Sequence, residues 1–176
     1  MKTIAALLFL IAVACGAASA APARGLRLIS VKGTSKVKLV YRANSIVVDL
    51  DEALAGTNGA LAGEAPHQIT TVFTIEKGNF IYLVAKVCSA SPISEPMAPC
   101  GDDHSCAVLW IKTDRALKSP VFQCEIYESC SYNYYDSNYL RDQDGLRITY
   151  GGAKKRQLVF ELLQPEKGLV VTELKD

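Results

Sequence analysis

The chain is a series of short segments in which apolar and polar residues alternate, separated by connections rich in Gly, Pro, Asn and Asp. In "KVKLVYR" (36–42), Val37, Leu39 and Tyr41 share one face and the basic residues lie on the other. Alternation of apolar and polar residues with a period of two is typical of a β-strand with one buried and one solvent-exposed face. Such segments predict strands near 26–32, 36–42, 45–50, 69–76, 80–88, 106–112, 121–128, 146–150, 157–163 and 169–174.

Residues 69–76 continue this pattern, which places four residues on one predicted face: Ile69, Thr71, Phe73 and Ile75. The connections 76–79 and 150–157 place glycine between successive strands and predict two hairpins. Many short strands without interleaved helices predict an all-β fold. We expect an antiparallel β-sandwich of about eight to ten strands with long disulfide-tied loops, and a β-barrel is the alternative.

Helical character is confined to residues 49–67, which begin at a capping residue, Asp49. Gly56, Gly59 and Gly63 would each weaken a helix by about 1 kcal/mol relative to Ala, so we expect at most one helical turn. Residues 89–105 and 129–145 are further long connections, where binding sites are often found. The absence of a repeat or a linker in the sequence predicts one domain over residues 21–176.

The first twenty residues have the pattern of a secretory signal peptide. Lys2 precedes an apolar run over residues 4–14, and Ala18-Ser19-Ala20 is a small-x-small cleavage site. The run is shorter than the roughly 20 apolar residues that a membrane span needs. We therefore expect a soluble, secreted protein; a lipoprotein-type cut before Cys15 is the less favoured alternative.

Charge gives no indication of a nucleic-acid partner. The chain has 19 basic and 18 acidic residues, and removal of Lys2 with the signal peptide makes the numbers equal. Bulk attraction to nucleic acid or to an anionic membrane is therefore not expected. No later segment is long and apolar enough to span a membrane.

The stretch "CGDDHSC" (100–106) raises the choice between a metal site and a disulfide. Five residues separate its two cysteines, whereas zinc ligands usually come in pairs two to four residues apart. Secreted proteins also tend to oxidise their cysteines. We therefore predict a disulfide, with no metal and no cofactor; a metal site with Asp102, Asp103 and His104 as ligands is the less favoured alternative.

Five cysteines remain after the signal peptide is removed, and the sequence alone does not determine their pairing. The preferred prediction joins Cys100 to Cys106 and forms a second bridge among Cys88, Cys124 and Cys130. Cys124 lies on the apolar face of its strand, so it is either a cross-strand partner for Cys88 or a buried free thiol. The unpaired cysteine could instead join two chains in a dimer.

Candidate catalytic groups are few. Only His67 and His104 are available for nucleophilic catalysis, and neither lies in a G-x-S-x-G or H-E-x-x-H motif. Aspartates are paired at 49/51, 102/103 and 142/144, but paired carboxylates need a cleft to act as acid and base. The sequence therefore favours a protein that is not an enzyme; a hydrolase using His104 or an aspartate pair is a minor alternative.

The most unusual segment is "YESCSYNYYDSNYLRD" (127–142), where tyrosines are interleaved with Ser, Asn and Asp. Recognition loops have this composition, because tyrosine gives a large amphipathic contact at low entropic cost. We expect it to bind a protein or carbohydrate ligand through Tyr132, Asn133, Tyr134, Tyr135 and Tyr139. In the structural alternative, Tyr134 and Tyr139 cover the end of the sandwich. The second functional hypothesis is a carrier that holds a lipid or small hydrophobe in a cavity.

Two further features have structural interpretations. Trp110 alternates with Val108 and Cys106 in an apolar strand and is expected in the core. The basic residues Lys154, Lys155 and Arg156 form a predicted hairpin tip, which we expect to keep the sheet soluble.

Overall fold

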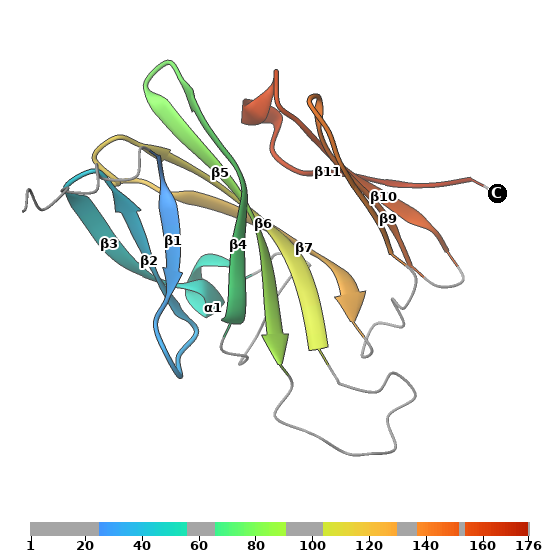
Figure 1. The fold of residues 1–176 in the computed structure, drawn as a ribbon, viewed down its shortest axis with the longest axis horizontal. Coiled ribbons are helices and arrows are strands. Elements are labelled where there is room, and N and C mark those ends of the chain that lie inside the picture. Colours follow the sequence, from blue (N-terminus) through green and yellow to red (C-terminus); the bar gives the residue numbers. More distant parts are fainter. Residues whose placement is uncertain (1–24, 56–65, 91–103, 130–136, 152–153, 176) are drawn as a thin grey trace, which may run out of the picture.

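The computed structural model describes residues 25–55, 66–90, 104–129, 137–151 and 154–175, and the predicted signal peptide, residues 1–20, lies outside them. In these residues nearly all regular structure is β, arranged in three antiparallel sheets (Figure 1). The first sheet contains β1 (Arg27–Ser30), β2 (Lys36–Tyr41) and β3 (Asn44–Asp49). The central sheet contains β4 (Pro66–Lys77), β5 (Phe80–Ala90), β6 (His104–Asp114) and β7 (Val121–Ser129). The third sheet contains β8 (Asn138–Arg141), β9 (Gly145–Tyr150), β10 (Arg156–Glu161) and β11 (Val170–Glu173).

The predicted all-β fold and both hairpins are confirmed. Strands β4 and β5 pair across residues 77–80, and β9 and β10 pair across residues 150–156. Among the described residues of the 49–67 segment, helix is confined to one turn, α1 (Leu50–Ala53), where the Asp49 side chain accepts a hydrogen bond from the Asp51 amide. Among the described strands, each of the three sheets has two unpaired edge strands, so none of the sheets closes into the alternative barrel. The sheets stack face to face as a sandwich.

The three sheets form three layers, with the central sheet in the middle (Figure 1). One apolar cluster joins the first sheet to one face of the central sheet, through residues such as Leu39 and Leu83. A second cluster joins the opposite face to the third sheet, through residues such as Val84 and Phe160. Because both faces of β5 and β6 are covered, neighbouring residues along these strands are buried in opposite directions.

The prediction that Ile69, Thr71, Phe73 and Ile75 share one face of β4 is wrong. The pairing of β4 with β5 shifts register between Thr71 and Phe73, which is the mark of a β-bulge. Val72 is consequently buried in the second cluster, while Thr71 is exposed. Ile69 packs against the first cluster, whereas Phe73 and Ile75 pack against the second.

Trp110 lies in the core, as predicted. Its ring is buried in the second cluster and tilts against Tyr82, with ring centroids 6.2 Å apart. The indole N–H donates to the Pro165 carbonyl at 3.0 Å. Pro165 begins a short 3-10 helix, η1 (Pro165–Lys167), so Trp110 fixes this connection onto the central sheet.

Strand β8 was not predicted, because it lies within the segment expected to be a loop. All four of its residues are exposed, and it pairs with β9 along one edge of the third sheet. No helix among the described residues has the length and apolar character to cross a membrane.

Candidate functional site

The predicted recognition segment connects two layers of the fold. It leaves β7, an edge of the central sheet, and enters β8, an edge of the third sheet (Figure 1). Tyr132, Asn133, Tyr134 and Tyr135 lie outside the described residues. Tyr139 lies on β8 and is 38% exposed.

Tyr139 meets two residues of the central sheet. Its ring centroid lies 6.3 Å from that of Tyr127 on β7, with the planes inclined at 47°. Lys86 on β5 places its Nζ atom 5.7 Å from the Tyr127 ring centroid and 6.0 Å from that of Tyr139. These distances are typical of cation–π contacts. We refer to Lys86, Tyr127 and Tyr139 as the Tyr–Lys cluster.

Strand periodicity and a bulge direct these side chains to the same side. Lys86 lies two residues from Val84 and therefore faces the third sheet. The pairing of β6 with β7 shifts between Cys106 and Ala107, so the partner of Cys106 is Glu128 and Tyr127 is the extra residue. The sequence indicated that the tyrosines of this segment could form a site, but it did not predict their contact with Lys86 of β5.

The Tyr127 hydroxyl is buried without a hydrogen-bond partner among the described residues, and the side chain is 1% exposed. Leaving such a group unpaired costs about 1–3 kcal/mol. Burial raises the pKa of Tyr127, and the nearby Glu128 and Tyr139 raise it further. The hydroxyl therefore stays protonated at neutral pH and can donate a hydrogen bond.

The second tyrosine of the cluster is also neutral at physiological pH. Burial raises the pKa of Tyr139, and Arg141 opposes this effect. The cluster thus presents a partly exposed aromatic ring, a buried phenol donor and the ammonium group of Lys86. Rings of this kind stack on sugars or on apolar side chains, and the donors bind acceptor oxygens.

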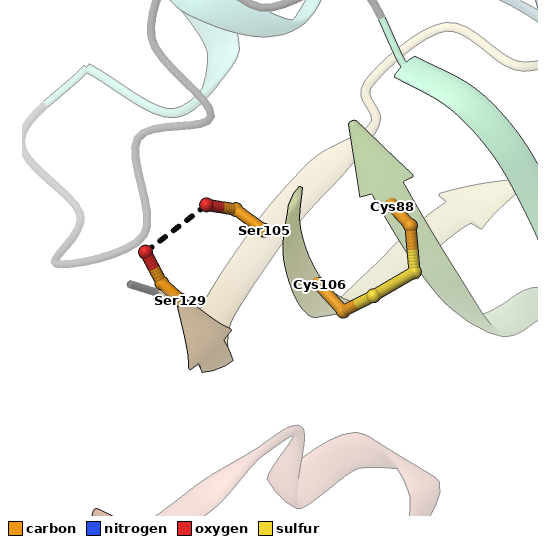
Figure 2. Close-up of a disulfide and its surroundings, with 4 residues drawn as sticks. All are labelled: Cys88, Ser105, Cys106 and Ser129. Carbon is orange, nitrogen blue, oxygen red and sulfur yellow. Dashed lines mark hydrogen bonds between the residues drawn. A yellow bond between two sulfur atoms is a disulfide. The ribbon is translucent and has the colours of Figure 1, made fainter. Parts of the chain in front are cut away.

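The strand ends beside the cluster are tied together (Figure 2). A disulfide joins Cys88 on β5 to Cys106 on β6, two residues that lie directly opposite each other in the register. On the neighbouring strand pair, the Ser105 hydroxyl donates to the Ser129 hydroxyl at 3.0 Å. The disulfide and the hydrogen bond hold β5, β6 and β7 together where the predicted recognition segment begins.

The predicted Cys100 to Cys106 bridge is wrong, because Cys106 is bonded to Cys88. Strand pairing decides this choice, since the register of β5 and β6 brings the two sulfur-bearing residues together. The second predicted bridge, among Cys88, Cys124 and Cys130, is also wrong as far as Cys88 and Cys124 are concerned, because Cys88 is bonded to Cys106 and Cys124 is a buried free thiol, one of the two alternatives for this residue. Cys100 and Cys130 lie outside the described residues.

Cys124 is poorly placed to join two chains. Its thiol is buried in the first apolar cluster. Burial raises the pKa of Cys124 to about 12, with a further contribution from Glu125. The reactive thiolate is therefore scarce at neutral pH.

A buried polar group that the sequence did not indicate lies between the central and third sheets. Tyr150 donates a hydrogen bond from its hydroxyl to Glu125 Oε1, and Arg156 Nη1 lies 3.1 Å from the same oxygen. Arg156, which was expected at an exposed hairpin tip, is instead partly buried. Glu125 on β7 thus bonds to Tyr150 on β9 and to Arg156 on β10, so these three residues join the two sheets. Since Arg156 balances the charge of the Glu125 carboxylate, we interpret their role as structural.

A hollow of about 320 Å³ lies at the turn between β8 and β9, and both polar residues, such as Asp144 and Arg147, and apolar residues, such as Leu163, line it. Asp142, which also lines it, accepts hydrogen bonds from the amides of Asp144 and Gly145, so it organises the turn.

Over the described ranges, no three His, Cys, Asp or Glu residues are grouped to hold a metal ion. Asp102 and Asp103 and the side chains of both histidines lie outside these ranges.

Comparison with known proteins finds no matching family model, no similar curated protein and no similar solved structure.

Proposed function

We propose that this chain is a secreted, non-enzymatic protein that recognises a protein or carbohydrate ligand. The Tyr–Lys cluster and the adjoining segment 130–137 form its binding site. The observation that carries the proposal is the Tyr127 hydroxyl, a buried donor without a partner among the described residues, next to the partly exposed ring of Tyr139. A ligand oxygen accepting from Tyr127 would remove the cost of that unpaired group.

The location supports recognition because a rigid scaffold surrounds the site. The Cys88 to Cys106 disulfide and the hydrogen bond from Ser105 to Ser129 restrain β5, β6 and β7 at this end. Binding residues are commonly found on loops that a rigid scaffold positions, because less entropy is then lost on binding. Residues 130–137 contain three tyrosines and one asparagine, the composition of a recognition loop.

The same features favour surface recognition over the rival hypotheses. The described apolar clusters consist of tightly buried side chains on both faces of the central sheet, which supports a filled interior over a lipid carrier. Asp142 stabilises a turn, which does not support its use as a catalytic base. The disulfide and the signal-like leader sequence both support secretion.

Glycan and protein arrays test the proposal. The wild type is compared with Tyr139→Ala, with Tyr134→Ala/Tyr135→Ala, and with Leu163→Ala as a control for loss of an exposed apolar side chain. Leu163 follows β10 and is 82% exposed. We expect the tyrosine variants to lose about 2 kcal/mol of binding free energy, roughly 30-fold in affinity, as for interface hot spots. Leu163→Ala should bind like the wild type; equal profiles for all four proteins would refute the assigned site.

A further inference from the structure

The charges of the chain are unevenly distributed although their sum is near zero. The first acidic residue is Asp49, whereas six basic residues lie in residues 21–48: Arg24, Arg27, Lys32, Lys36, Lys38 and Arg42. Residues 49–176 contain 12 basic and 18 acidic residues. The first sheet is therefore basic, and the rest of the chain is acidic.

The alternation of residues along β1 and β2 places the basic side chains on the outer face of the first sheet. Leu28, Val37 and Leu39 are buried against the central sheet, so Arg27, Lys36 and Lys38 lie on the opposite, exposed face. Lys36 and Lys38 occupy alternate positions of β2, and Arg42 follows the end of that strand. The six residues of β2 span about 20 Å at ~3.4 Å per residue, so its basic side chains form a row along the strand. Arg27, on the neighbouring strand β1, lies beside this row because it pairs with Val40 of β2.

The basic groups of this face are available to a partner. Within the described ranges, none of the ion pairs involves Arg27, Lys36 or Lys38, whereas Lys77 pairs with Glu166 at 2.9 Å. Asp49 is opposite Lys36 in the register, but its carboxylate accepts hydrogen bonds from the Ser35 hydroxyl and the Asp51 amide. These hydrogen bonds leave the negative charge of Asp49 in place, so Asp49 offsets Lys36, but Arg27 and Lys38 have no acidic neighbour in the register and the face keeps a net positive charge.

We propose that the outer face of the first sheet binds a linear sulfated polysaccharide. A row of cations along one strand complements a chain that carries repeated anions, and each contact releases bound counterions. The exposed apolar side chains flanking Lys38 are Ile29 and Val47, at 46% and 60% exposure. Both are aliphatic, whereas membrane-surface sites combine basic residues with larger apolar and aromatic anchors, so a polysaccharide is favoured over a lipid surface. This surface is separate from the Tyr–Lys cluster, which lies on the other side of the central sheet.

Retention on immobilised heparin, a sulfated polysaccharide, tests the proposal. The full-length secreted protein is compared with Lys36→Gln/Lys38→Gln and with Lys154→Gln/Lys155→Gln, a control that removes the same charge from exposed positions before β10. We expect the first variant to elute at clearly lower salt and the control to elute like the wild type. In heparin titrations, the slope of log affinity against log salt should fall by about one for each lysine removed from β2.

Three outcomes would overturn the proposal. Wild-type protein that passes through the column at about 0.15 M salt has no such site. Equal shifts in the two variants would show that bulk charge alone retains the protein. Binding to vesicles of phosphatidylserine and phosphatidylcholine without binding to heparin would assign the face to a membrane. If Lys36→Gln/Lys38→Gln does not fold, Arg27→Gln on β1 provides the same test.

Discussion

Removal of a single oxygen atom from Tyr127 should separate binding from stability. In Tyr127→Phe the ring and its contacts with Tyr139 and Lys86 remain, while the buried hydroxyl that has no partner among the described residues is lost. Since an unpaired buried hydroxyl costs about 1–3 kcal/mol, the variant should be as stable as the wild type or more stable by about 1 kcal/mol. Its affinity for an array ligand should fall by about 1 kcal/mol, or fivefold.

Tyr150→Phe is the matched control. The Tyr150 hydroxyl donates to the buried carboxylate of Glu125, and a hydrogen bond to a charged group is worth about 1.5–3 kcal/mol. Urea unfolding should therefore show a loss of about 2 kcal/mol for Tyr150→Phe, with unchanged ligand affinity. A comparable loss of stability in Tyr127→Phe would show that its hydroxyl has a structural partner and would contradict this prediction.

Three further predictions concern the scaffold. Cys88→Ala/Cys106→Ala should lower the unfolding free energy by about 3 kcal/mol, since the bridge closes a loop with a sequence separation of 18. Because the pKa of Cys124 rises from 9.0 to about 12 on folding, the unfolded state loses its thiol proton first as pH rises; stability should fall above pH 9 by about 1.4 kcal/mol per unit, less steeply in Cys124→Ala. Gly145→Ala should cost well over 1 kcal/mol, and more than Gly33→Ala, because φ is +148° and an added Cβ would meet a backbone carbonyl.

Urea unfolding across pH measures all three effects. The disulfide prediction would be contradicted by a loss below about 1 kcal/mol, which a cross-link of this loop length should exceed. Parallel alkaline decline in the wild type and in Cys124→Ala would show that the thiol is not protected by folding. Equal costs for the two glycine variants would contradict the backbone argument.

Most strands could be predicted because their alternation is local. Val37, Leu39 and Tyr41 are buried on one face of β2, as their spacing indicated. The third layer was not predicted, although the sequence contains a signal for it. Residues 81–87 and 106–111 are almost continuously apolar, a pattern typical of strands buried on both faces, so the signal for a covered central sheet was present.

Bulges and registers account for the other errors. The bulge beside Val72 redirects β4, and the local sequence Thr71-Val72-Phe73 contains no glycine or proline to mark the change. The disulfide depended on Cys88 and Cys106 being opposite in two long strands, which is a non-local property. For the same reason, the composition of residues 127–142 indicated recognition, but the contribution of Lys86 depended on how the sheets stack.

The most direct test of the account is to map a bound ligand by amide chemical shifts. Isotope-labelled protein is titrated with the strongest ligand from the arrays. We expect the largest changes at Lys86, Tyr127 and Tyr139 and in residues 130–137. Changes confined to another surface, such as the hollow beside Asp144, would contradict it.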